Sequence, residues 1–402
     1  MKSFECSSCG GFMEWDPERQ CLSCPNCGSS VPVMRDVPQL PVPFEWGTVP
    51  PEIGKLSEFS DSPVICPSCH ADIRPREETV SMLCPYCGTA LVFDEKQSFY
   101  LTPNGVVPEA ISLRQAMKSV EKWSRTHFFA PTVFPKLIEK KFIRNCYVPF
   151  WVFSANIAYS FEGVGSTFSE RAAGLSGTSS YLARKHRREQ NSEHQCSGRN
   201  RFTASDVRIC ASSKLSRAAS DAISAVSYGK VCDYRPEYLA GRIVDLGNIG
   251  IETGMKQAEA RMREMVEIHA KAMIMSHGYT SVRITSFSIK ISDASYSQIL
   301  IPCYRIIYRY AGKLYSVVVN GENGRAIGDY PLSVMKAVII PFVLCMLLAV
   351  FLCKVLDVSV GSAGAFGLVL SITFSAAAYV LSSIRKKANI RDHGRIFFRT
   401  DD

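Results

Sequence analysis

The sequence predicts a multi-domain protein with two small β units at the N-terminus, an α+β body, and a C-terminal hairpin of two transmembrane helices. Three observations predict this fold class: nine of the sixteen cysteines lie within the first 87 residues, helix and strand patterns fill the centre, and two long apolar stretches lie near the end. The expected boundaries are 1–35 and 61–95 for the β units, 36–60 for a Pro-rich linker, 96–332 for the body, 333–384 for the hairpin and 385–402 for a basic tail.

The formal charges divide the chain into an acidic head and a basic body. Residues 1–95 contain six Lys and Arg against fourteen Asp and Glu, a net charge of −8, so the remaining residues contribute +17 to the total of +9. Affinity for nucleic acid depends on basic side chains that neutralise phosphates. The charge count therefore disfavours nucleic acid as a partner of the head.

Four C-x-x-C pairs supply the candidate metal ligands. Fourteen residues separate the two pairs in each β unit, and every cysteine of the second unit lies sixty positions after its counterpart in the first. Zinc binds four thiolates tetrahedrally, and two such knuckles joined by a hairpin present four sulfurs to one ion. We therefore predict two zinc ribbons with one structural zinc cofactor each, held by Cys6, Cys9, Cys24 and Cys27 and by Cys66, Cys69, Cys84 and Cys87.

Two other arrangements of these cysteines agree less well with the sequence. Redox-active pairs would need a thioredoxin-like βαβ pattern, which does not surround them, and a cross-braced set of eight ligands fits the strict repeat poorly. The N-terminal residues contain no apolar run that could serve as a signal peptide. We therefore expect reduced, metal-bound thiols on the cytosolic side.

Two uncharged stretches, Ala337–Cys353 and Val360–Ile384, predict the membrane hairpin. Each is long enough, or nearly so, to cross a hydrocarbon core of about 30 Å as a helix. Basic residues flank the pair, so the positive-inside rule places the N-terminal units, the body and the tail in the cytoplasm. Neither stretch contains an ionisable residue, so we expect an anchor in the lipid bilayer, and the alternative is a buried hairpin of a soluble domain.

Within the body, spacing and composition predict both helices and strands. The expected helices are Ala110–Thr126, Pro135–Asn145 and Met255–Met275, and the expected strands are Tyr147–Phe161 and the segments across 281–320. The motif that begins at Val148 resembles the one that begins at Ile301, which favours two related halves.

A polar, Gly- and Ser-rich segment, Phe161–Phe202, predicts a long loop. It contains a basic run that is the candidate contact for an anionic surface: Arg184, Lys185, Arg187 and Arg188. Three interpretations remain open, namely a solvated loop, contact with anionic lipid headgroups, and contact with nucleic acid.

Several segments of the chain are similar to those of a known family. They are Tyr147–Trp151, Ala211–Leu215, Tyr238–Gly241, the AEARMREM helix and Val317–Pro331. With the order of ribbon, body and hairpin, they resemble bacterial membrane-anchored zinc-ribbon proteins, catalogued as transcription-factor-IIB-type zinc-ribbon or primosomal-helicase-like proteins. The resemblance implies a protein tethered to the bacterial inner membrane that works with partners in envelope maintenance or stress.

The sequence bears on three classes of function, namely an adaptor, a nucleic-acid-binding protein and an enzyme. We favour an adaptor that recruits a protein partner at the membrane, with a membrane-attached nucleic-acid-binding protein as the alternative. An enzyme is disfavoured, because the sequence contains no Ser/His/Asp motif, no H-E-x-x-H and no Gly-rich phosphate loop. We therefore expect no catalytic residues.

Overall fold

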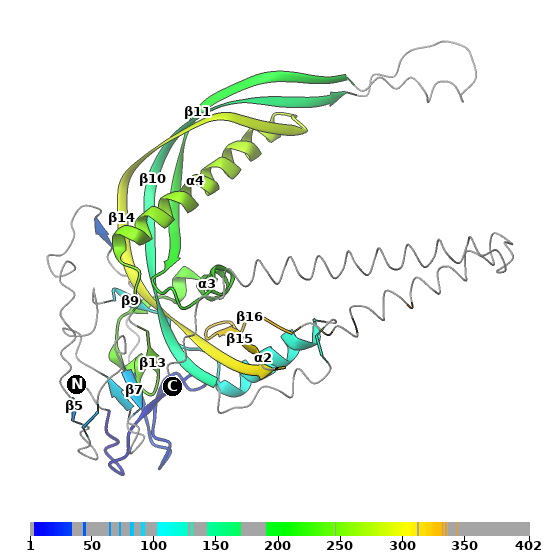
Figure 1. Cartoon of the computed structure of the whole chain (residues 1–402). Helices are drawn as coiled ribbons and strands as arrows, with labels where there is room; N and C mark the ends of the chain where they lie inside the picture. The colour runs from blue at the N-terminus through cyan, green and yellow to red at the C-terminus, as the bar shows by residue number, and fades with distance from the viewer. Residues whose placement is uncertain are drawn as a thin grey trace, which may run out of the picture.

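The structure is a computed structural model in which most of the described chain is β-sheet (Figure 1). It describes residues 4–33, 43–45, 64–65, 72–73, 81–83, 90–92, 103–127, 130–131, 143–169, 190–245, 247–311, 313–331, 333, 336 and 343. These form a three-stranded sheet, two two-stranded sheets and a nine-stranded sheet that builds the body.

The N-terminal sheets are small and antiparallel. Their strands are β1 (Glu14–Asp16), β2 (Cys21–Ser23) and β3 (Ser30–Pro32) in the first unit, and β5 (Val64–Ile65), β6 (Asp72–Ile73), β7 (Ser81–Leu83) and β8 (Ala90–Val92) in the second. Leu22 pairs with Val31 in the first unit, and Met82 pairs with Leu91 sixty positions later. The described backbone register therefore repeats between the two units.

The large sheet has the strand order β11-β10-β14-β15-β16. The five strands of this order are β10 (Ile143–Ser169), β11 (Gln190–Cys210), β14 (Ser281–Tyr310), β15 (Lys313–Asn320) and β16 (Ala326–Gly328). Four short strands add to the sheet: β4 (Phe44–Glu45), β9 (Gly105–Val106), β12 (Cys232–Asp233) and β13 (Ile243–Val244). Strand β4 comes from the predicted linker and pairs with β14, where Phe44 packs on Tyr296 with ring centroids 5.5 Å apart.

Three strands continue beyond the rest of the sheet as a curved arm (Figure 1), formed by residues 155–169, 190–204 and 281–294. The described parts of the predicted loop Phe161–Phe202, residues 161–169 and 190–202, are therefore strand, and the prediction is wrong there. Residues 170–189 lie outside the described residues. Small and polar side chains alternate there with buried ones such as Phe161, as in a sheet with one covered face. At Gly163 a Cβ would lie 2.6 Å from the Arg283 carbonyl oxygen, so the close strand approach requires glycine.

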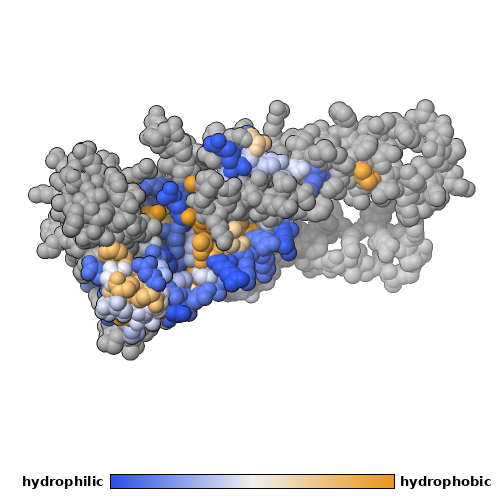
Figure 2. Space-filling view, turned by 90° about the horizontal axis from the view of Figure 1, so that it is seen from below, coloured by the Kyte–Doolittle hydropathy of each residue, from blue (hydrophilic) through white to orange (hydrophobic). Residues whose placement is uncertain are grey.

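Three α-helices, α2 (Leu113–Arg125), α3 (Arg217–Ser224) and α4 (Ile251–Ser276), and two 3-10 helices, η4 (Tyr228–Lys230) and η5 (Pro236–Leu239), have described bounds. Helix α2 begins at a capping box, in which Ser112 and Gln115 satisfy each other's backbone N–H groups. Helix α4 packs along the arm against Trp151 and Phe153, whereas α3 packs near Phe150 on the other face of the sheet. Seen from below, the described surface is mostly hydrophilic with a band of hydrophobic side chains at its centre (Figure 2).

Two short strands of the body pair in parallel with the two central strands in an equivalent way. Strand β9 pairs with β14 through Val106 and Leu300, and β13 pairs with β10 through Val244 and Tyr147. The neighbouring residue pairs of the two pairings are related by the same differences in residue number. The two pairings are therefore related by an approximate two-fold axis between β10 and β14.

The same offsets relate the contacts that begin helices α2 and α4. The Tyr304 hydroxyl donates to the Ile111 carbonyl at 2.8 Å, and the Trp151 indole N–H donates to the Ile249 carbonyl at 2.8 Å. In both cases an aromatic residue of one half holds the helix that precedes the long strand of the other half. The two halves of the body are interleaved.

The predicted fold class is corrected by the structure. The described chain is mostly β-sheet with three helices, and none of its helices is long and apolar enough to cross a membrane. The longest, α4, has 26 residues but carries charged side chains along its exposed face. The stretches expected to form the hairpin, 337–353 and 360–384, lie outside the described residues.

The predicted localisation is corrected by the same finding. The inner-membrane anchor, with the N-terminal units and the tail 385–402 in the cytoplasm, depended on a spanning helix, and the described residues contain none.

The expected helix Pro135–Asn145 lies outside the described residues up to position 142, and its last three residues begin β10.

Candidate functional site

Four cysteines of the first ribbon converge on one point. The Sγ atoms of Cys6, Cys9, Cys24 and Cys27 all lie within 4.8 Å of one another. The Cys6–Cys27 and Cys9–Cys24 sulfur distances are 3.5 and 3.6 Å. Cys6 and Cys24 are buried and the other two are exposed. The group therefore faces the protein on one side and solvent on the other.

Two equivalent backbone turns aim these thiols. Gly10 donates to the Cys6 carbonyl and Gly28 to the Cys24 carbonyl, each at 2.9 Å. Both glycines have positive φ, 68° and 76°, a conformation that costs other residues more. The glycine after each C-x-x-C pair thus closes the knuckle and leaves both sulfurs on its inner side.

The hydroxyl of Ser29 lies 2.9 Å from the sulfurs of both Cys6 and Cys27. Its hydrogen bond is the main reason that the pKa of Cys6 is lowered to about 6, and it also lowers the pKa of Cys27. Cys6 and Cys27 therefore favour thiolate, which is the form that binds a metal ion. At Cys9 the Gly11 backbone hydrogen bond acts in the same direction, but the neighbouring Cys27 and Cys24 thiols outweigh it and raise the pKa of Cys9 to about 12.

The residues fit zinc. Four thiolates at about 2.3 Å from a tetrahedral zinc ion have sulfurs roughly 3.8 Å apart, and the observed distances are close to that value. A group with four cysteine ligands leaves no open coordination position for a substrate. The four-cysteine group can hold one zinc ion, as a structural site.

The first ribbon is docked on the body through Trp15. This side chain is 2% exposed and packs edge-on against Tyr238, with ring centroids 4.8 Å apart. It belongs to the docking cluster, which we define as Trp15, Val106, Tyr147, Tyr238, Leu239, Val244 and Leu300. Two symmetry-related pairs of the body, Val106 with Val244 and Tyr147 with Leu300, lie in this cluster, so one ribbon covers the two-fold axis.

A buried ion pair completes the docking site. Glu109 is fully buried, and its carboxylate accepts from Arg242 Nε and from Asn145 Nδ2, both at 2.6 Å. Arg242 also donates to the Trp15 carbonyl at 2.8 Å, while the Trp15 indole donates to the Glu109 carbonyl at 3.1 Å. Burial, followed by the charge of Glu109, raises the pKa of Tyr147 far above its usual range. The ion pair therefore ties the ribbon to the body with its polar atoms paired.

Sequence reasoning missed this docking. One signal was present: Trp15 breaks the repeat, because the residue sixty positions later is Pro75. A second signal was Gly241, which precedes Arg242 and has φ +75°, and where a Cβ would lie 2.9 Å from the Glu14 side chain. An aromatic residue on one ribbon and a glycine in the body thus mark a contact between distant segments.

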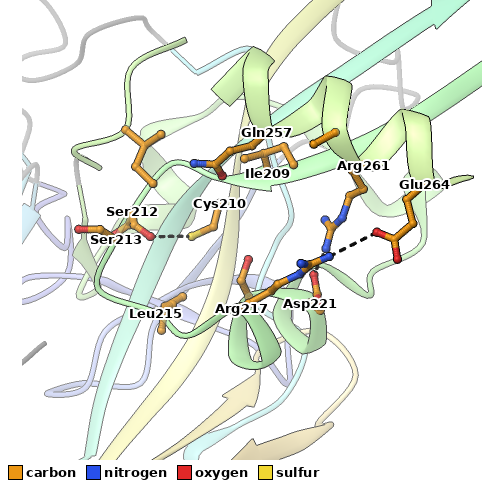
Figure 3. Close-up of a pocket in the computed structure, with 13 residues that line it drawn as sticks. Ile209, Cys210, Ser212, Ser213, Leu215, Arg217, Asp221, Gln257, Arg261 and Glu264 are labelled. Atoms are coloured by element: carbon orange, nitrogen blue, oxygen red, sulfur yellow. Dashed lines mark hydrogen bonds and ion pairs between the residues drawn. The ribbon is translucent and has the colours of Figure 1, made fainter. Parts of the chain in front are cut away.

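A pocket of about 410 Å³ lies between α3, α4 and the end of β11 (Figure 3). Its charged side chains pair with one another, Arg217 with Glu264 at 3.6 Å and Arg261 with Asp221. Burial raises the pKa of Cys210, at the floor of the pocket, to about 12. A protonated thiol and paired charges are not the arrangement of an activated nucleophile with its base.

The remaining predicted site residues lie outside the described residues. They are the second set of zinc ligands, Cys66, Cys69, Cys84 and Cys87, and the basic run Arg184, Lys185, Arg187 and Arg188. The structure therefore brings together the first ligand set.

The fold and the site define a β-sheet protein with a docked group of four cysteines that could hold a metal ion, compatible with a zinc ribbon. The chain is similar to the uncharacterized protein YdjG of Bacillus subtilis (strain 168), with 25% identity over 343 residues that cover 82% of this chain and 90% of that protein. No family model matches the chain. No solved structure matches it either. Membership of the zinc-ribbon family named above stays a prediction.

Proposed function

We propose that this protein is a non-catalytic adaptor that zinc stabilises and that binds a protein partner through its arm. The observation that carries the proposal is the solvent-facing side of α4, where Ile268 is 62% exposed and Met275 is 48% exposed. With the exposed Ala272 they share one helix face, because residues three, four and seven apart are neighbours on a helix. Grouped apolar side chains on a surface are what a protein partner covers.

The edge of the arm supports the same function. Among the described strands, β11 pairs with β10 on one side, and from Glu193 to Thr203 its other side has no described strand. An open strand edge presents unpaired backbone groups to which an extended segment of a partner can add. The exposed Arg199 and Arg201 protect this edge against non-specific pairing.

The adaptor proposal includes two zinc ions per chain. The first site has the geometry described above, and the backbone pairings of the second unit repeat those of the first sixty positions later. The repeated backbone pairing with the same cysteine spacing supports a second ion at Cys66, Cys69, Cys84 and Cys87.

Site-specific photo-crosslinking in the native cells tests the adaptor proposal. A photoreactive amino acid at Ile268 is expected to capture one protein in a discrete band, and the same probe at Glu259 is the matched control. Glu259 is exposed on the opposite side of the same helix, nine residues away. The expected result is a band at Ile268 that Met275→Asp weakens. No band at Ile268, or the same band at Glu259, would contradict the proposal.

A second candidate function, nucleic-acid binding, is favoured by one observation. Exposed Arg199, Arg201, Arg283 and Lys290 lie on the arm face away from α4, as their pairing with β10 requires. Phosphate binding by these four side chains would give an affinity that falls steeply with salt. The adaptor proposal predicts no salt-dependent shift of a labelled RNA or DNA duplex, and a shift lost in Arg199→Ala/Arg201→Ala would favour the second candidate.

A further inference from the structure

Two cysteines outside the metal centre face each other across the two central strands of the body. Cys146 of β10 and Cys303 of β14 are directly opposite in the antiparallel register, and their Sγ atoms are 3.3 Å apart. Neither forms a disulfide in the structure. Directly opposed residues have Cα atoms about 4.5–5.5 Å apart, which lies within the range that a disulfide bridges. The backbone is therefore already placed for a bond between them.

The two thiols differ in access. Cys303 is fully buried, whereas Cys146 is partly exposed. The hydrogen bond from Cys146, together with burial, raises the pKa of Cys303 well above its usual value. Because the two sulfurs are 3.3 Å apart and Cys146 is the more accessible, Cys146 is placed to react first and Cys303 to follow as the second thiol.

We propose that Cys146 and Cys303 are a reversible cross-strand disulfide site that hydroperoxides oxidise. In the first step the Cys146 thiolate attacks the hydroperoxide, a sulfur–oxygen bond forms, the oxygen–oxygen bond breaks, and the alcohol or water leaves with a proton. In the second step the Cys303 sulfur attacks the Cys146 sulfenic acid, the sulfur–sulfur bond forms, and water leaves with the Cys303 proton. The two thiols lose two electrons and the hydroperoxide gains them.

The position of the pair gives the bond a structural consequence. A Cys146–Cys303 disulfide would join the two halves of the body covalently beside their two-fold axis. Cys146 lies between Asn145 and Tyr147, and both of these contact Glu109 of the docking site. Oxidation therefore acts on the strand segment that holds the first ribbon.

Peptide mapping of the zinc-loaded full chain tests the proposal. The protein is treated with hydrogen peroxide, its free thiols are alkylated, and it is digested without reductant. The expected product is a peptide pair linked through Cys146 and Cys303 that increases with peroxide and disappears with dithiothreitol. Zinc release, followed with a chromogenic chelator in the same samples, reports whether the ribbon thiols react first.

Three variants sharpen this test. Cys303→Ser is expected to stop the reaction at the sulfenic acid, so a dimedone adduct accumulates on Cys146. Cys146→Ser is expected to give no adduct on Cys303. Cys210→Ala removes another buried body thiol and is expected to form the linked pair to the wild-type extent. If wild-type Cys146 and Cys303 both remain open to alkylation, after unfolding, at peroxide concentrations that release zinc, the proposal is wrong.

Discussion

The two halves of the body make equivalent contacts with each other but differ at the site where the first ribbon docks. Both halves use an aromatic side chain, Trp151 or Tyr304, to hold the start of the other half's helix. At the docking site, however, Tyr147 of one half corresponds to Leu300 of the other, and both lie under Trp15. A single ribbon lies on the two-fold axis and contacts two different side chains, so the symmetry of the body is broken at the docking site.

The polar part of the docking site differs in the same way. Glu109 precedes α2, and Gly247 takes the corresponding place before α4. Arg242 corresponds to Asn104, whose side chain accepts from the Gln298 N–H at 2.9 Å. The buried ion pair that binds the ribbon therefore joins Glu109 of one half to Arg242 of the other half, whereas the equivalent positions carry a glycine and a neutral amide. The comparison indicates that the polar contacts of the ribbon lie on one side of the two-fold axis.

The largest change is expected on removal of a metal ligand. Cys24→Ser takes away one of four thiolates, and zinc contributes roughly 10–16 kcal/mol to the folding of small zinc-finger peptides. We expect the variant to lose one zinc ion per chain, measured by atomic emission, and to become protease-sensitive within residues 4–33. The free thiol Cys21→Ser is the control, and equal zinc loss in both variants would count against the ligand set.

Loss of the docking side chain is expected to release the ribbon with its metal. Trp15→Ala should cost about 3–5 kcal/mol, the usual range for a buried tryptophan. Chelator should then remove one zinc ion much faster than from the wild type. Trp123→Ala, on α2 away from the ribbon, is the control and should leave the rate of zinc removal unchanged. An unchanged rate in Trp15→Ala would show that docking does not protect the metal.

Breaking the ion pair is expected to cost nearly as much. Glu109→Ala leaves Arg242 buried without its carboxylate partner, which costs about 3–5 kcal/mol in comparable cases. The double variant Glu109→Ala/Arg242→Ala should be less destabilised than the two single effects together, and urea denaturation measures all four proteins. Additive effects would mean that the two charges do not stabilise each other.

The smallest effect is expected at the corresponding glycine. Gly247 has φ +77°, and a Cβ there would lie 2.7 Å from the Ala211 carbonyl oxygen. Gly247→Ala should therefore destabilise the body by about 1–3 kcal/mol through backbone strain. Zinc removal by chelator should keep the wild-type rate. A faster rate would show that the Gly247 side of the two-fold axis also supports the ribbon.

The periodicity of apolar residues predicted those helices and strands whose local pattern is not overridden by tertiary packing. The spacing of Met255, Ala258 and Met262 predicted α4, and these residues are buried there. The same spacing of three and four residues, continued towards the end of α4, would place His269 on the buried face, but His269 is exposed and Ala270 is buried. The helix follows a curved sheet, so the residues that face the sheet recur nearly every four positions and move away from the straight-helix pattern.

The four-cysteine ligand set could be predicted from the sequence, whereas its docking on the body could not. Ligand spacing is a local property of residues 6–27, and the structure gathers the four sulfurs that this spacing indicated. Docking joins Trp15, Glu109 and Arg242, which are far apart in the chain, and no local pattern records their contact. The arm was missed for a related reason, because its small polar residues are typical of loops unless a covered face is known.

Hydrogen exchange with and without zinc tests the central claim, that the metal-bound ribbon stabilises the side of the two-fold axis that carries Glu109 and not the side that carries Gly247. The equivalent amides are those of Ala110 and Ile111, which donate to Gly321, and those of Asn248 and Ile249, which donate to Ala211. After zinc removal we expect the first pair to exchange at least about tenfold faster, a loss of roughly 1.4 kcal/mol of protection, and the second pair to keep its rate. Equal acceleration of both pairs, or of neither, would contradict the account.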